Sequence, residues 1–298
     1  MIDFVSQAGV SFRRQEKAVS IHRQTLYTRL KAKAVRHTEE AKYNDDEALV
    51  YWITELKTIH PSWGIRRVRA FIRKHTEIKL GRKRTARILR EKNLLCSRIK
   101  KRVHRTAKKR AAATGMNQLW ATDMTSFMLT SGVKVFLVVV LDIFTRRIVG
   151  WHLSRRCRAK EWLAALDMAL CTEFPEGSRG KGLTLRMDNG CQPTSSAYLD
   201  TLQTCEITGE WIGFNSPEQN AHVESVIGTL KQDWLWPEEC DTYDEALKLC
   251  QRAAAEYNSD HPHSSLDMLS PNEFTRLVIE GRVRITENQT VEILPKAA

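Results

Sequence analysis

Apolar residues recur at helical spacing in the first third of the chain, and strand and helix patterns alternate after residue 115. Residues 46–60, 65–74 and 82–93 each place apolar side chains three and four positions apart, which is typical of amphipathic helices. The stretch between the first two contains Pro61 and Gly64 and favours a break. The pattern therefore predicts a three-helix module within residues 41–96.

Residues 5–36 have the pattern of short helices, and we assign residues 1–40 to a helix-turn-helix-like module. Within them, residues 19–30 fit the second half of a helix-turn-helix, with Ser20 as a helix cap and Ile21 and Leu26 facing a core. Arg23 would then point toward a nucleic-acid groove or backbone. An ordinary helical hairpin is the alternative interpretation of this pattern.

After residue 115, strands are predicted at 120–128, 133–141, 147–153, 183–187 and 206–210, and helices at 159–174, 195–204, 216–236 and 242–258. Short turns join the first three strands and predict an antiparallel meander. Three strands, helix, strand, helix, strand, helix is the order of an α/β ribonuclease-H-like core, a mixed five-stranded sheet flanked by helices. We assign this core to residues 116–280 and a C-terminal tail to 281–298.

Charge divides the chain at the same place. The whole chain carries +12, but residues 1–115 carry +20 and residues 116–298 carry −8. Phosphate neutralisation by Lys and Arg is the main source of sequence-independent DNA affinity, so the basic part predicts a polyanion partner. Residues 97–115 form a basic linker that we expect to become ordered on nucleic acid. Besides Arg23, the candidate DNA contacts in the helices and the linker are Arg66, Arg67, Arg84, Arg87, Lys100, Lys101 and Arg102.

Composition narrows the setting. The seven cysteines are scattered, with no Cys-x-x-Cys pair, which argues against a disulfide framework or a Cys-rich zinc site and favours a reducing cytoplasm. The sequence has no apolar run long enough for a membrane span and no apolar N-terminal signal. It also lacks a Gly-rich phosphate loop, which argues against an NTPase.

Three acidic residues lie in distinctive settings. Asp123 falls on the first predicted strand, and Asp188 ends the fourth strand just before the turn residues Asn189 and Gly190. Open α/β sheets place ligand sites at such a carboxyl edge. Because these strands are neighbours in a ribonuclease-H-like sheet, the two carboxylates are expected to meet.

The third acid, Glu224, lies on the helix predicted at 216–236. Ser216 is the expected N-cap, Pro217 suits the first helical position and Gln219 completes a capping box. Asn220, Glu224 and Lys231 then share one face of this helix. We expect the carboxylate to bind metal and the amide and ammonium groups to position DNA. A surface helix with spaced charges is the alternative.

Oxygen ligands of this kind suit hard divalent ions, so Asp123, Asp188 and Glu224 are predicted to hold two Mg²⁺ ions, with Mn²⁺ as a substitute. Two such ions can activate an attacking oxygen and stabilise the leaving oxygen at a phosphodiester. Asp142 competes for a ligand role, but its place before Arg146 and Arg147 favours stabilisation of the turn or an ion pair.

These motifs together resemble the DDE transposase/integrase superfamily, in particular the OrfB-type transposases of bacterial insertion sequences. The resemblance rests on residues 63–68 (Trp-Gly-Ile-Arg-Arg-Val), 84–95, 120–125, 188–190 and 215–221, with Glu224 and with Lys231 seven positions later. Residues 257–258 (Tyr-Asn), 262–266 (Pro-His-Ser-Ser-Leu) and 270–271 (Ser-Pro) resemble the C-terminal signature. The family usually has Arg where this chain has His261, and the His-His-Cys-Cys zinc module of retroviral integrases is not matched.

The resemblance implies metal-dependent cleavage at transposon ends followed by attack of the freed 3′-hydroxyl on another phosphodiester. It also implies double-stranded DNA as substrate, a homo-multimer that joins two ends, and an OrfA-type partner from an upstream frame in a bacterial, nucleoid-associated setting. The chain shows no sustained heptads and is expected to lack the leucine zipper of that partner. The alternatives are a ribonuclease-H-like nuclease that only hydrolyses, and a catalytically silent DNA-binding regulator.

Overall fold

The computed structural model describes residues 45–78, 80–96, 113–212, 220–285 and 291–294. The chain divides into two compact units. One consists of residues 1–102 with the short segments 232–239 and 262–269, and the other of residues 103–231, 240–261 and 270–298. The boundary near residue 102 falls inside the basic stretch that the sequence marks as a linker.

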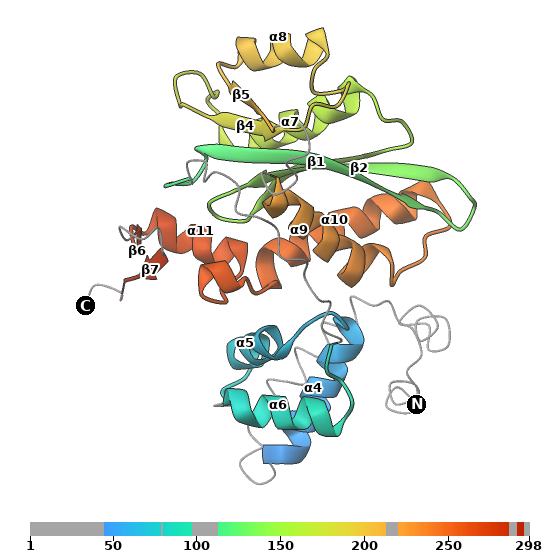
Figure 1. The fold of residues 1–298 in the computed structure, drawn as a ribbon, viewed down its shortest axis with the longest axis vertical. Coiled ribbons are helices and arrows are strands. Elements are labelled where there is room, and N and C mark those ends of the chain that lie inside the picture. Colours follow the sequence, from blue (N-terminus) through green and yellow to red (C-terminus); the bar gives the residue numbers. More distant parts are fainter. Residues whose placement is uncertain (1–44, 79, 97–112, 213–219, 286–290, 295–298) are drawn as a thin grey trace. The chain divides into compact units, whose positions relative to one another are not determined.

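The first unit contains the three predicted helices, α4 (Asp45–Ile59), α5 (Ile65–His75) and α6 (Arg82–Glu91). Their apolar faces form one core in which Leu49, Ile53, Trp63, Val68 and Ile88 are almost completely buried. Trp63 comes from the loop between α4 and α5, and the others recur at helical spacing, so the amphipathic pattern explains both the helices and the faces by which they pack. The three helices are confirmed (Figure 1).

Two short segments from later in the chain belong to this unit. A single π-helical turn, η2 (Lys231–Leu235), begins where helix α9 ends, and its residues from Gln232 onward lie in the first unit. A 3-10 turn, η3 (Ser264–Leu266), lies in the segment 262–269 and buries Leu266. Neither segment was expected to join the helical module.

The second unit is built on a five-stranded sheet in the order β3-β2-β1-β4-β5. The strands are β1 (Leu119–Met128), β2 (Lys134–Asp142), β3 (Ile148–Ser154), β4 (Thr184–Met187) and β5 (Thr208–Trp211). β1, β2 and β3 pair antiparallel, whereas β4 is parallel to β1 and to β5. The predicted meander, the mixed sheet and the ribonuclease-H-like element order are confirmed.

Helices cover both faces of this sheet (Figure 1). Helices α7 (Ala159–Glu173) and α8 (Ser196–Thr204) lie on one face, and α9 (Ala221–Leu230) and α10 (Tyr243–Asp260) lie on the other. Alternate residues of a strand point to opposite faces. Trp120 and Val138 therefore pack with Trp162 of α7. Ala121 and Asp123, at the alternate positions, project toward the side of α9.

One glycine lets α7 approach the sheet closely. Gly150 lies on β3, and a methyl group at this position would lie 2.3 Å from the carbonyl oxygen of Ala165 and 2.8 Å from the Cβ of Ala169. Both alanines belong to α7 and are fully buried. The small residues on both sides thus set the distance between this helix and the strand.

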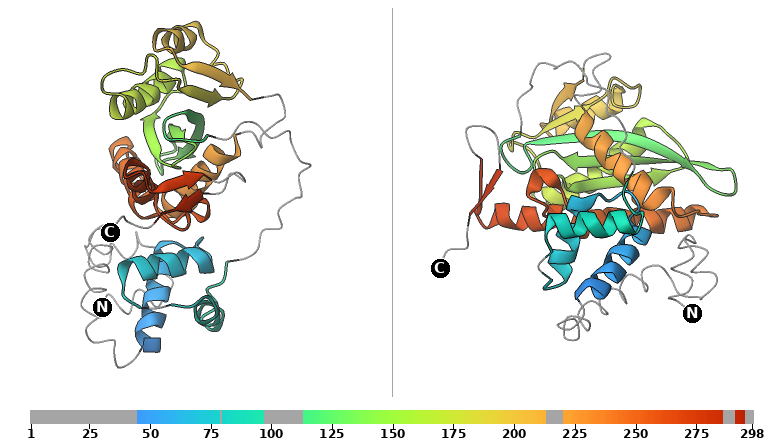
Figure 2. Two further views of the ribbon diagram at one scale, coloured as in Figure 1. Left: turned by 90° about the vertical axis from the view of Figure 1, so that its left-hand side faces the viewer. Right: turned by 60° about the horizontal axis from the view of Figure 1, so that its bottom comes forward.

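The C-terminal region continues the second unit with α11 (Pro271–Ile279) and two short antiparallel strands, β6 (Val283–Ile285) and β7 (Val291–Ile293) (Figure 2). Ser270 caps α11 and forms a capping box with Glu273, and Pro271 occupies the first turn. The region predicted as a tail therefore carries a small hairpin. No helix among the described residues is both long and apolar enough to cross a membrane.

Candidate active site

Asp123 occupies the middle of β1, opposite Val139 of β2. Its side chain is half-buried, and its Oδ1 accepts a hydrogen bond of 2.7 Å from the backbone N–H of Met124. β1 is the central strand of the sheet, with β2 and β4 as its neighbours, so this carboxylate projects from the middle of the sheet.

Asp188 follows β4 at its carboxyl end, directly beside β1. Its Oδ1 accepts a 3.0 Å hydrogen bond from the N–H of Gly190, which closes an Asx-type turn. The side-chain amide of Asn189 donates a hydrogen bond of 2.6 Å to the carbonyl oxygen of Ile212, just beyond β5. The Asp-Asn-Gly motif thus holds one carboxylate and fastens its loop to the neighbouring strand.

Glu224 lies in the first turn of α9, exposed to solvent. The helix begins at Ala221 with Asn220 at the N-cap, so the described helix starts five residues later than predicted. The proposed cap residues 216–219 lie outside the described residues. A carboxylate so close to the start of a helix is favoured by the positive end of the helix dipole.

Asn220 holds this helix against the sheet. It is 3% exposed, and its side-chain amide donates a hydrogen bond of 3.4 Å to the carbonyl oxygen of Thr122, the neighbour of Asp123 on β1. Its Oδ1 is buried and has no hydrogen-bond partner among the described residues. The contact gives Asn220 a part in seating Glu224 beside Asp123, and its predicted contact with DNA stays a prediction.

Three predicted site residues act on the pKa of a fourth, Asp123, through their charges. Burial raises the pKa of Asp123 to about 6, the N–H of Met124 opposes this change, the negative charges of Asp188 and Glu224 add to it, and the positive charge of Lys231 opposes it. Charges act on one another in this way only when they lie near each other. The three acids and the lysine therefore lie near one another, on β1, at the end of β4 and in the α9–η2 segment.

This donor set fits hard divalent cations. All three groups are carboxylates, and the charge repulsion that adds to the effect of burial on the pKa of Asp123 is the repulsion that a bound cation would relieve. Within the described parts of the chain, no three His, Cys, Asp or Glu side chains are grouped closely enough to hold a single ion together.

The predicted DNA contacts of the helical module lie on α5 and α6. Arg66 and Arg87 are exposed, and Arg67 and Arg84 are partly exposed. Both helices begin after a glycine without a side-chain cap and carry no acid in their first turn. Arginines and uncapped N–H groups at a helix start suit phosphate. Contact with DNA stays a prediction for these four, and Arg23, Lys100, Lys101 and Arg102 lie outside the described residues.

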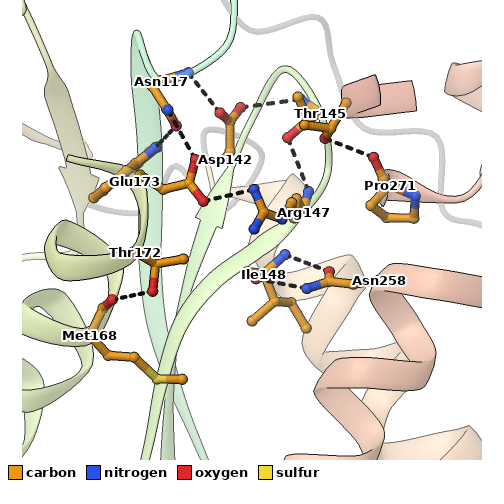
Figure 3. Close-up of polar contacts among 12 residues, drawn as sticks. Asn117, Asp142, Thr145, Arg147, Ile148, Met168, Thr172, Glu173, Asn258 and Pro271 are labelled. Carbon is orange, nitrogen blue, oxygen red and sulfur yellow. Dashed lines mark hydrogen bonds and ion pairs between the residues drawn. The ribbon is translucent and has the colours of Figure 1, made fainter. Parts of the chain in front are cut away.

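Asp142 does not join the candidate metal ligands. It is fully buried and accepts hydrogen bonds from the N–H groups of Asn117, Phe144 and Thr145, at 2.7 to 3.1 Å. Arg147 instead pairs with Glu173 of α7 at 2.7 Å. Figure 3 shows this network around the β2–β3 turn. The interpretation of Asp142 as a turn-stabilising residue is confirmed.

Part of the C-terminal signature has a structural role. Asn258, on α10, accepts a hydrogen bond from the N–H of Ile148 and donates to its carbonyl, both at 2.9 Å (Figure 3). It thereby mimics a paired strand on the free edge of β3. His261, which replaces the usual arginine, is 1% exposed and stacks on Tyr257 with 5.3 Å between ring centroids. A side chain so buried does not offer the DNA contact of an exposed arginine.

Sequence reasoning missed a group of basic side chains around His222. Burial and the nearby charges of Arg146 and Arg186 lower the pKa of His222 to about 4, although part of this residue reaches solvent. Arg186 lies on β4 and forms an ion pair of 3.0 Å with Glu210. Arg146 lies in the β2–β3 turn with a positive φ of 61°. Only the folded topology brings these three residues together.

Comparison with known proteins identifies the family of the domain that carries the three acids. Two family models of the integrase core domain match residues 113–217 and 206–271. Together the matched residues span more than half the chain and contain all three acids. The chain belongs to the integrase core family. An HTH-like domain matches residues 44–103 and so covers α4–α6 of this integrase core protein. The resemblance drawn from the motifs is confirmed, whereas the helix-turn-helix predicted at 1–40 lies outside that match.

Insertion-sequence proteins are among the relatives. The chain is 33% identical over 165 residues to a transposase of element IS904 from Lactococcus lactis, and the match covers 55% of this chain and 63% of that one. It is 27% identical over 250 residues to transposase InsD of element IS2 from Escherichia coli, with 79% and 81% covered. A protein of element IS407 from Burkholderia multivorans is 27% identical over 245 residues, with 82% and 86% covered.

Solved structures also match, at lower identity. A chain of the simian T-cell lymphotropic virus intasome is 17% identical, with 77% of this chain and 74% of that chain covered and a TM-score of 0.47. The catalytic domain of the Mos1 mariner transposase is 18% identical, with 55% and 82% covered and a TM-score of 0.37.

Proposed function

We propose that this protein is a DNA transposase that cleaves DNA at transposon ends and joins the freed 3′-hydroxyl to another phosphodiester. The observation that carries the proposal is the convergence of Asp123, Asp188 and Glu224, expressed in the raised pKa of Asp123. Family membership supports this class of reaction, because the integrase core descriptions cover the segments that hold all three acids.

We assign Asp123, Asp188 and Glu224 as the ligands of two Mg²⁺ ions, which Mn²⁺ can replace. Bound there, the metal would activate the attacking oxygen and stabilise the leaving oxygen of an in-line displacement at phosphorus. The chain's own part is positioning. β1 and β4 fix the two aspartates, and Asn220 seats the helix of Glu224 against β1. Lys231 then offers a positive charge to the DNA backbone beside these acids.

Delivery of DNA falls to the basic helices. We assign Arg66, Arg67, Arg84 and Arg87 to phosphate contacts, and Arg23 and the linker residues Lys100, Lys101 and Arg102 to the same task. Two transposon ends must be joined, so we propose a homo-multimer on double-stranded DNA in the bacterial cytoplasm, at the nucleoid. An OrfA-type protein from an upstream frame is the proposed partner that supplies further end recognition.

A strand-transfer assay separates this function from its two alternatives. The full-length protein would be incubated with Mg²⁺, a labelled candidate transposon end and a target plasmid. Joined product supports the transposase, nicking without joining supports a ribonuclease-H-like nuclease, and a mobility shift without cleavage supports a silent regulator. The basic module favours the first outcome, since a hydrolytic nuclease has no need of a separate DNA-gripping domain.

The variant Asp188→Asn tests the triad. It keeps the size of the side chain and the acceptor for Gly190, but it loses the negative charge that a metal needs. We expect strand transfer to fall by at least about 10³-fold, as for loss of a group that acts only in the transition state. The Kd for end DNA should stay within about threefold, and Asp167→Asn, on the exposed side of α7, serves as the matched control. Strand transfer at the wild-type rate in Asp188→Asn would refute the assignment.

A further inference from the structure

A buried carboxylate lies immediately beyond the candidate active-site helix, in the π-helical turn η2. Asp233 is 0% exposed, and each of its two oxygens has a donor within the first unit. The indole N–H of Trp63 donates 2.9 Å to Oδ2, and the hydroxyl of Ser62 donates 2.5 Å to Oδ1. The partners come from the loop between α4 and α5, 170 and 171 residues earlier in the chain.

Aromatic packing reinforces the contact. His60 stacks flat on Trp63, with 4.1 Å between ring centroids and 5° between ring planes, and meets the edge of Trp234 at 5.7 Å. Its Nδ1 lies 4.0 Å from Oδ2 of Asp233. The three partners His60, Ser62 and Trp63 with Asp233 are here called the Asp233 clamp. Trp63 is the first residue of the basic module's sequence motif, so that motif has a docking role besides any contact with DNA.

The backbone of η2 explains how the clamp is presented. Asp233, Trp234 and Leu235 are consecutive, yet all are buried at 4% exposure or less. An α-helical turn on a surface seldom buries three residues in a row, because successive side chains point about 100° apart. The wider π turn re-aims them, and such turns occur often at functional sites. η2 starts at Lys231, directly after the last residue of α9.

We propose that Asp233 is a positioning residue, which fixes the C-terminal end of the helix that carries Glu224 and Lys231 by holding the next turn in the basic helical module. The inference rests on the proposed function for its catalytic consequence. Burial of a carboxylate costs free energy that a well-packed apolar pair would not, and such groups are retained where direction and register matter. Two directed hydrogen bonds at Asp233 set the rotation of η2 about its axis, and apolar packing alone would not.

The Asp233 clamp adjoins the proposed DNA contacts on one side and is continuous with the helix of Glu224 on the other. Residues 60–63 adjoin α5, which carries the proposed phosphate contacts Arg66 and Arg67. The chain continues from the clamp through Lys231 to Glu224 without a break in the helical backbone. Loss of the clamp should therefore impair the chemical step on bound DNA more than the binding of DNA itself.

Two variants and their combination test the clamp in the full chain. Asp233→Ala removes the acceptor, and Trp63→Phe removes the donor while it keeps an aromatic ring to stack on His60. At saturating pre-cleaved end DNA with Mg²⁺, we expect the strand-transfer rate constant of Asp233→Ala to fall roughly 10- to 100-fold, the loss that a misplaced reacting group brings. The Kd for that DNA should change by less than about threefold. Asp167→Ala is the matched control.

The double variant distinguishes a direct contact from two separate effects. Both substitutions remove the same hydrogen bond, so Trp63→Phe combined with Asp233→Ala should be no slower than Asp233→Ala alone, within about threefold. Rate losses that multiply would overturn the proposal. So would a wild-type rate in Asp233→Ala, or a rate that falls only in proportion to weakened DNA binding, which would indicate a merely structural role in the module.

Hydrogen exchange supplies a readout that needs no activity. Backbone amides of residues 226–235 should exchange at least about tenfold faster in Asp233→Ala than in the wild type, because local opening is no longer opposed by the clamp. Amides of β2 should keep their rates. Unchanged exchange at 226–235 would overturn the clamp. If wild type and Asp188→Asn alike fail to join DNA, the proposed function is refuted while this exchange experiment still decides the role of Asp233.

Discussion

The variant Asp123→Asn should make the metal-free catalytic unit more stable at neutral pH. Burial, with the nearby charges of Asp188 and Glu224, raises the pKa of Asp123 from an ordinary value of 3.8 to about 6. A raised pKa means that the folded state disfavours the ionised carboxylate. Ionisation of this side chain therefore costs stability, which is present at low pH and is lost as pH rises from about 4 toward 6.

The size of the effect follows from the shift. A change from 3.8 to about 6 corresponds to about 3 kcal/mol at pH 7.5, at about 1.4 kcal/mol per pKa unit. By the same linkage only about 0.5 kcal/mol remains at pH 4, where the unfolded carboxyl is itself partly protonated. Asn keeps the acceptor for the N–H of Met124 and carries no charge, so Asp123→Asn should recover most of this free energy.

Hydrogen exchange of the buried β2 amides, such as those of Val138–Val140, measures the stability of this unit in the full chain. In EDTA at pH 7.5 they should exchange roughly 10²-fold more slowly in Asp123→Asn than in the wild type, and nearly equally at pH 4. Mg²⁺ should stabilise the wild type and have much less effect on the variant. A variant that is no more stable at pH 7.5, or a difference that does not depend on pH, would refute the reasoning.

Two further substitutions test the frame that holds the site. Asn258→Ala should lower the free energy of unfolding by about 1–3 kcal/mol, because it removes both hydrogen bonds to Ile148. Asn258→Asp can still accept the hydrogen bond from the N–H of Ile148, so its Tm should lie between those of the wild type and Asn258→Ala. Gly150→Ala should cost about 1–3 kcal/mol by pushing α7 off the sheet, whereas Gly228→Ala, with open space around it, should leave Tm unchanged or raised. A Tm for Gly150→Ala equal to that of the wild type would contradict the close approach at Ala165.

The core elements could be predicted closely because each obeys a local rule. β2 was expected at 133–141 and is found at Lys134–Asp142, since a run of buried apolar residues bounded by turns has few other solutions. Asp188 could be placed at a strand end from the Asn-Gly that follows it. α11 also has a local signal in the sequence, the Ser-Pro-x-Glu capping box from Ser270 to Glu273.

What could not be predicted depends on residues far apart in the chain. Burial and the nearby charges of Arg146 and Arg186 lower the pKa of His222, and these three residues come from separate parts of the chain. Asp233 falls within the helix predicted at 216–236, but the helix changes to a π turn at Lys231 and the carboxylate is buried. Periodicity assumes a constant pitch, so it fails where the pitch changes. The same assumption extended the predicted helix as one piece to residue 236.

The candidate site combines two kinds of support that should respond differently to perturbation. Asp123 and Asp188 project from paired strands of one sheet, where backbone hydrogen bonds fix their separation. Glu224 depends instead on one helix, seated at its start by the bond from Asn220 to Thr122 and continued at its end into η2. Since the three charges repel one another, the acid on the helix is the one that can move away when no cation is bound. Order at Glu224 should therefore depend on metal and on both helix ends, whereas order at the two aspartates should follow the sheet alone.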